Sequence, residues 1–293
     1  MPHYSESLYC ARAFAVGAAA AGFFSRTLLG LFGRALGWLY AVAHPAKVET
    51  VRGNLDLLRK EPQSTAAARR VFSHFGGTLA DYFYLSRRPA GAASALIDEG
   101  VGYENLKKAH DAGKGCFIVM PHLSFFELGG YIMDKLGFRT TALSYPEPSH
   151  ELGRWRAQYR LRWGVETLEI GDDEFAFLAV LKELRKGRFV AALVDRPAAA
   201  HALPISFPGG AVPFSTGVPL LAFMAQCPMI PVTVVRKKSG FYRLEALAPI
   251  WPEARGTRRE TVEYYTRQVA DALSPALTNH PEQWYQFVEV KPS

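Results

Sequence analysis

The stretch CFIVMPHLSFFELGG, residues 116–130, decides the fold. Its first five residues form an apolar run that is too short for a helix and is bounded by a glycine and a proline. This pattern predicts a buried strand over residues 116–120, followed by a turn and a helix. His122 then stands at the exit of the strand, and Glu127 lies near the start of the helix.

On both sides of this stretch, apolar runs alternate with amphipathic segments. The pattern predicts helices over residues 64–85, 104–112, 154–164, 172–187, 217–226 and 258–277, and strands over 139–145, 165–170, 188–195, 229–236 and 242–250. Such alternation is typical of an α/β fold with a mostly parallel central sheet flanked by helices. In these folds the ligand binds beyond the carboxyl ends of the strands, so residues just after each strand are candidates for the site.

Residues 1–45 have a different character, with three apolar blocks separated by Arg26 and Arg34. No block reaches the roughly 18–20 apolar residues that a spanning helix needs. We expect an N-terminal helical membrane-binding segment here, with its arginines at the headgroups and its aromatic side chains below them. A buried hairpin of the core and a cleaved signal peptide are the alternatives. The expected domains are therefore this segment and a catalytic domain over residues 46–293.

Charge and cysteine content narrow the class of partner. The chain of 293 residues has a net charge of +7 and 49% hydrophobic residues. The basic excess is strong in the first 60 residues, where it is interleaved with apolar side chains, and this favours anionic lipid over nucleic acid. Three widely spaced cysteines support neither a disulfide framework nor a metal site, and they fit a reducing, cytoplasmic location.

His122 and Glu127 are the candidates for catalysis. A carboxylate that holds one ring nitrogen of a histidine fixes the tautomer and leaves the other nitrogen free to take a proton. A hydroxyl bonded to that nitrogen becomes a nucleophile toward a thioester. The alternative is a histidine that only makes structural hydrogen bonds at the strand end. Spacing alone does not decide between the two.

The motif from His122 to Glu127 resembles the H-x4-D/E motif of the lysophospholipid acyltransferase superfamily. The rest of the chain resembles its branch of bacterial lipid A late acyltransferases. The similar segments occur in order: VRGNLDLL (51–58), RLRWG (160–164), LKELRKGRFVAALVDRP (181–197), FPGGAVPFSTGVPLLA (207–222), MIPVTVVR (229–236) and HPEQWYQF (280–287).

This resemblance implies acyl transfer from an acyl carrier protein or CoA thioester to a hydroxyl of a lipid or glycolipid acceptor, at the cytoplasmic face of a bacterial inner membrane. It implies no metal and no bound cofactor. His122 is then the base and Glu127 the residue that orients it. The candidates for binding substrate or oxyanion are Arg160, Arg162, Asp195, Arg196, Gly209 and Gly210. A solvated basic helix face is the alternative for Arg160 and Arg162, together with Arg154 and Arg156, and a turn or cap is the alternative for Asp195.

Two departures from the family pattern bear on the acceptor more than on the reaction. Asp195-Arg196 stands where an Asp-Gln pair is expected, and Phe125-Phe126 stands where Asn-Trp is expected. Other lipid acceptors, hydrolysis of the thioester, and a non-catalytic protein that binds lipid or acyl carrier therefore remain alternatives. We also expect an apolar tunnel that leads from His122 beside the following helix. Its wall would include side chains such as Phe126, Leu128, Tyr131 or Ile132, and Gly129 or Gly130 would limit the acyl length.

Overall fold

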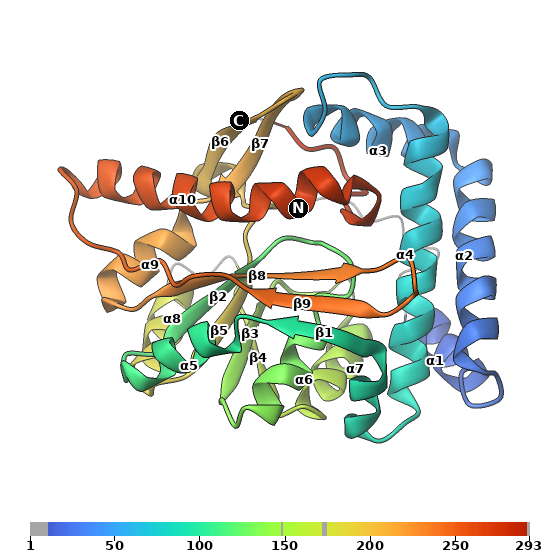
Figure 1. Ribbon diagram of the computed structural model, residues 1–293, viewed down its shortest axis with the longest axis horizontal. Helices are drawn as coiled ribbons and strands as arrows, with labels where there is room; N and C mark the ends of the chain where they lie inside the picture. Colours follow the sequence, from blue (N-terminus) through green and yellow to red (C-terminus); the bar gives the residue numbers. More distant parts are fainter. Residues whose placement is uncertain (1–10, 148, 172–174, 292–293) are drawn as a thin grey trace.

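The computed structural model describes residues 11–147, 149–171 and 175–291, and its centre is a seven-stranded sheet (Figure 1). The strand order is β1-β9-β8-β2-β5-β3-β4. All neighbours are parallel except β8 and β9, which confirms the mostly parallel α/β fold. The strands are β1 (Ile97–Val101), β2 (Cys116–Met120), β3 (Thr140–Ser144), β4 (Val165–Glu169), β5 (Phe189–Leu193), β8 (Met229–Arg236) and β9 (Tyr242–Ala246).

Helices cover both faces of the sheet and create two hydrophobic cores. One core contains residues of α4 (Thr65–Ser86), α5 (Tyr103–Asp111), α6 (Leu128–Lys135) and α7 (His150–Leu161). The other contains residues of α8 (Ala176–Arg185), α9 (Gly217–Ala225) and α10 (Arg258–Asn279). This double coverage explains why the central strand β2 is buried along its whole length.

Local sequence explains where two long helices begin. Ser64 caps α4 by accepting a hydrogen bond from the amide of Ala67, and Thr257 and Glu260 form a capping box at the start of α10. Sequence periodicity did not predict β1 or the hairpin of β6 (Ala202–Phe207) and β7 (Gly210–Ser215). The edge strand β1 carries two acidic residues, and β6 contains a proline, so neither has the apolar run of a buried strand.

The N-terminal helices form a separate layer at one side of the sheet (Figure 1). They are α1 (Ala11–Ala20) and α2 (Arg26–Ala43), and α3 (Pro45–Leu57) follows directly. Helix α2 packs along α4 through glycines: a methyl group at Gly33 or Gly37 would overlap backbone atoms of Gly76 or Phe72. Within the described part of the chain, none of the helices combines the length and apolar character needed to cross a bilayer.

Candidate active site

The register of two neighbouring parallel strands brings His122 and Asp195 together. Met120 at the end of β2 pairs with Leu193 at the end of β5. Two residues further along each strand exit stand His122 and Asp195, and His122 Nδ1 lies 2.7 Å from Asp195 Oδ1. The pair therefore lies at the carboxyl end of the sheet, where ligands bind in folds of this class.

Asp195 is fully buried and held by several donors. Its carboxylate accepts hydrogen bonds from the backbone N–H of His122, from the indole of Trp284 at 2.7 Å and from the amide of Gln286 at 3.1 Å. Burial by itself would raise the pKa of Asp195, but His122 and these hydrogen bonds hold that pKa well below its usual range. Asp195 is therefore ionised, and Nδ1 of His122 carries the proton that it accepts.

The surroundings of His122 favour its neutral imidazole. Burial lowers the pKa of its imidazole, the charge of Arg196 lowers it further, and Asp195 acts in the opposite direction. With Nδ1–H bound to Asp195, Nε2 is the nitrogen that can take a proton. The side chain is 21% exposed and lines the large cavity described below, so a substrate hydroxyl can reach it.

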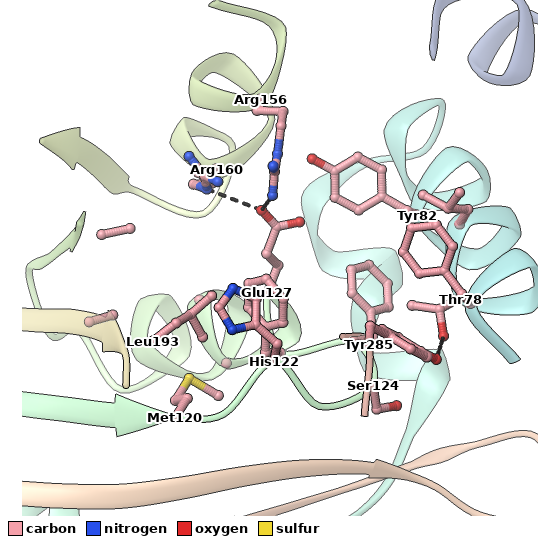
Figure 2. Close-up of a pocket in the computed structure, with 18 of the residues that line it drawn as sticks. Thr78, Tyr82, Met120, His122, Ser124, Glu127, Arg156, Arg160, Leu193 and Tyr285 are labelled. Carbon is pink, nitrogen blue, oxygen red and sulfur yellow. Dashed lines mark hydrogen bonds and ion pairs between the residues drawn. The ribbon is translucent and has the colours of Figure 1, made fainter. Parts of the chain in front are cut away.

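The sequence suggested that Glu127 holds a ring nitrogen of His122. In the structure, Asp195 holds Nδ1 of His122 instead. The carboxylate of Glu127 binds Arg156 at 3.2 Å and Arg160 at 3.1 Å (Figure 2). Burial would raise the pKa of Glu127, but these two arginines lower it. The turn from His122 to Glu127, in which Ser124 has φ 51°, places Glu127 at the start of α6 and close to the arginines of α7.

The other candidate residues divide into two groups. Arg160 and Arg196 line the same cavity as His122. Arg162 lies elsewhere, because it donates to the carbonyl oxygens of Leu85 and Arg88. Gly209 and Gly210 also lie elsewhere: they belong to the β6–β7 hairpin, which packs against the end of α3. These three residues therefore lie outside the lining of the cavity that contains His122, and their contact with substrate stays a prediction.

His122 lies in the wall of a cavity of about 1000 Å³ that is lined mostly by apolar side chains. The cavity runs between the sheet and α6, where Phe126, Gly129, Gly130 and Ile132 line it as expected for a tunnel. It also reaches residues of α2 such as Phe32. Leu128 and Tyr131, also expected in the wall, are buried in the core instead.

The sequence did not single out three residues that surround the candidate site. Arg156 was considered as part of a solvated helix face, yet it is mostly buried and bridges Glu127 and Glu147. Trp284 and Gln286 were noted only within a C-terminal motif, because no local pattern shows that this segment returns to β2 and β5. Among residues 11–147, 149–171 and 175–291, no three His, Cys, Asp or Glu side chains converge as a metal site.

Comparison with known proteins identifies the family of the chain. The model of a family described as bacterial lipid A biosynthesis acyltransferase matches residues 3–289. The chain belongs to this family. A phosphatidylinositol mannoside acyltransferase from Mycolicibacterium smegmatis is 23% identical over 189 residues, which is 64% of this chain. The match spans 60% of that relative's length, less than two thirds of it.

Proposed function

We propose that the protein transfers a fatty acyl chain from a thioester to a hydroxyl group of a glycolipid at a membrane surface. The observation that carries this proposal is the pair of His122 and the buried Asp195, with Nδ1 2.7 Å from Oδ1, in the wall of a large apolar cavity. A base that faces an acyl-sized apolar cavity suits the transfer of an acyl group to a hydroxyl.

His122 takes part in both proton transfers of the reaction. Nε2 accepts the proton of the acceptor hydroxyl as its oxygen bonds to the thioester carbonyl carbon. Asp195 stabilises the imidazolium that forms. The tetrahedral intermediate then collapses, the carbon–sulfur bond breaks, and Nε2 returns its proton to the leaving thiolate. The products are an ester and a free thiol, so the step needs no metal or redox partner.

Positive charge at the cavity stabilises the oxyanion of that intermediate. Arg196 lies near enough to His122 to lower its pKa, and its guanidinium is fixed by Gln286 Oε1 and the carbonyl of Tyr285, each at 2.9 Å. We propose that this preorganised guanidinium of Arg196 stabilises the oxyanion. Glu127, which is held by Arg156 and Arg160, then serves as a fixed acceptor for hydroxyl groups of the acceptor headgroup.

We place the membrane against α2. Its apolar side chains point outward: Phe23 just before the helix is 88% exposed and Leu36 is 64% exposed, and Leu31, Phe32 and Trp38 are also exposed. A monomeric soluble protein rarely presents such a continuous apolar surface. Because Phe32 and Leu36 also line the cavity of His122, a lipid at this surface has an apolar path to the site. Residues 1–45 are then the membrane-binding segment, on the cytoplasmic face of the inner membrane.

A glycolipid is the acceptor class that the comparisons support. The family is described by lipid A biosynthesis and the relative is named for a phosphatidylinositol mannoside, so both names point to lipids that carry sugars. The polar group of Glu127, Arg156 and Arg160 beside His122 suits such a headgroup. An acyl carrier protein is the proposed donor, with acyl-CoA as the alternative.

The test uses purified protein, an acyl-carrier or CoA thioester, and vesicles with or without a glycolipid extract. We expect the thiol to be released only when the glycolipid is present, with the acylated lipid detected by mass spectrometry. His122→Ala is the control for contaminating activity. Thiol release without lipid would identify a thioester hydrolase instead, and no release under any condition would favour a non-catalytic lipid-binding protein.

A further inference from the structure

The C-terminal segment 283–286 clamps both strand exits of the site. Leu123 forms an antiparallel bridge with Trp284, the amide of Tyr285 donates to the carbonyl of His122 at 2.9 Å, and the amide of Ser124 donates to the carbonyl of Gln283 at 2.8 Å. This segment is therefore bound along the whole turn that presents His122, although it lies about 160 residues away in the chain.

Two side chains of this segment reach the carboxylate of Asp195. The indole N–H of Trp284 donates to Oδ2 at 2.7 Å, and the amide of Gln286 donates to the same oxygen at 3.1 Å. Oδ1 is thereby left to receive Nδ1 of His122. Trp284, Gln286 and Asp195 are each at most 2% exposed, so solvent cannot replace a lost donor easily.

We propose that Trp284 is a positioning residue for acyl transfer: its indole N–H fixes the Asp195 carboxylate in the orientation that holds His122. Gln286 supports the same oxygen. This inference rests on the proposed function for its effect on rate, but the geometry of the His122–Asp195 pair can be measured without turnover. Trp284 is not part of the lining of the cavity that contains His122, so its indole acts on the site through Asp195.

The expected consequence follows from the charges around the pair. A carboxylate that loses a buried donor concentrates its charge and stabilises a neighbouring cation more strongly. The charged groups near His122 are Asp195, Arg196 and Arg156. Loss of the Trp284 indole N–H alters only the first of these, the carboxylate of Asp195. Trp284→Phe should therefore raise the pKa of His122 by about half a unit to one unit. The loosened carboxylate should also lower kcat roughly 10-fold, with KM for both substrates unchanged.

The experiment is an NMR titration of protein with ¹⁵N-labelled histidine, in which His122 is assigned by its absence in His122→Ala. Gln283→Met is the matched control, because the buried Gln283 belongs to the same segment and its side chain makes two hydrogen bonds, but to the backbone of Arg236. It should lower the melting temperature and leave the pKa of His122 unchanged. An equal pKa shift in both variants, or none in Trp284→Phe, would overturn the proposal.

A second variant protects the test against a folding failure. Benzothienylalanine at position 284 keeps the shape of the indole and replaces the N–H with sulfur, so it should give the same pKa shift with a near-normal melting temperature. An unchanged pKa in this variant would also overturn the proposal. If the pKa moves as expected but His122→Ala retains full transfer, the positioning role stands and the proposed mechanism fails.

Discussion

The carboxyl edge of the sheet and the N-terminal layer are held by different means. At the sheet edge, Asp195 is fully buried and bonded to two segments that are far from it in sequence, the turn at His122 and the C-terminal segment 283–286. In the N-terminal layer, α2 packs through glycines along one side, and most of its larger side chains face outward. The hydrogen bonds at the sheet edge fix the position of His122, whereas the packing of α2 leaves an apolar surface exposed.

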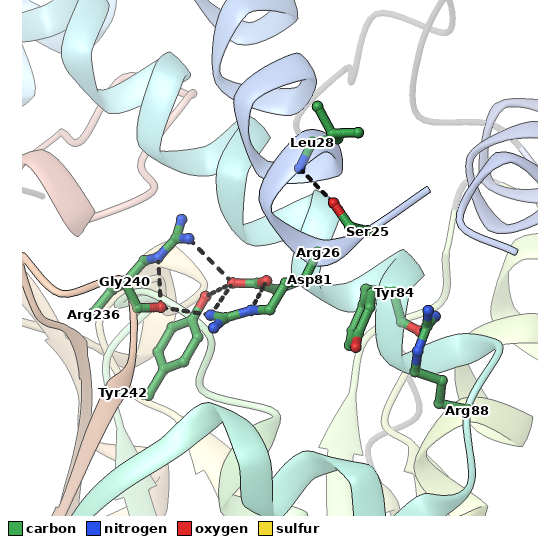
Figure 3. A network of polar contacts seen from close by, with 9 residues as sticks. All are labelled: Ser25, Arg26, Leu28, Asp81, Tyr84, Arg88, Arg236, Gly240 and Tyr242. Carbon is green, nitrogen blue, oxygen red and sulfur yellow. Dashed lines mark hydrogen bonds and ion pairs between the residues drawn. The ribbon is translucent and has the colours of Figure 1, made fainter. Parts of the chain in front are cut away.

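One polar network joins the N-terminal layer to the core. Asp81 of α4 is buried and binds Arg26 of α2 at 2.8 Å, Tyr242 at 2.7 Å and Arg236 at 3.5 Å (Figure 3). Because a buried carboxylate is stable only with such partners, this network fixes the start of α2 relative to β8 and β9. The apolar surface of α2, though exposed, therefore has a defined position relative to the active site.

The largest expected effect is at the sheet edge. His122→Ala removes the base, so kcat for acyl transfer should fall by about 10²–10⁴. The melting temperature should stay near that of the wild type, because the loss is chemical. Single-turnover assays with purified donor and acceptor measure the effect. Retention of half of the wild-type rate would exclude His122 as the base.

The second effect concerns the junction between the two regions. Asp81→Asn leaves two arginines without their buried partner and should lower the free energy of unfolding by about 3 kcal/mol. Asp98→Asn is the matched control, because Asp98 forms a half-exposed pair with Lys237 that contributes little. Denaturant unfolding compares the two variants. Equal small losses would show that the network does not secure α2.

Much of the fold could be predicted from sequence, because apolar runs such as residues 116–120 report burial directly. The partner of His122 could not, because Asp195 becomes its neighbour only through the order of β2 and β5 in the sheet. Glu127 was favoured because it is near in sequence, but two arginines of α7 attract it. Asp195 and Glu127 both follow strands closely in the sequence, so their positions alone do not show which of them contacts His122.

The third effect tests the open surface of the N-terminal layer. Phe32→Glu combined with Leu36→Glu places two charges on it and should weaken binding to anionic vesicles at least about tenfold. The stability of the protein should change little, since both side chains are exposed. Vesicle sedimentation measures the binding. Unchanged sedimentation would place the membrane contact elsewhere on the molecule.

The smallest effect lies inside the cavity. A methyl group at Gly130 would come within 3.0 Å of Val165 and 3.5 Å of Trp163, both of which line the cavity. Gly130→Ala should therefore narrow it and lower the preference for longer over shorter acyl chains by about tenfold. Gly53→Ala, where the added methyl meets open space, is the control. An unchanged chain-length profile at normal activity would remove Gly130 from the acyl path.

The central claim is that Asp195, rather than Glu127, orients the catalytic histidine, and one kinetic comparison tests it directly. Asp195→Asn and Glu127→Gln each remove one buried charge with little change of shape. We expect Asp195→Asn to lower kcat by about 10²–10⁴, as loss of the orienting carboxylate does in related triads, with KM nearly unchanged. Glu127→Gln should act mainly on KM for the acceptor. A large loss of kcat in Glu127→Gln together with a mild effect of Asp195→Asn would contradict this account.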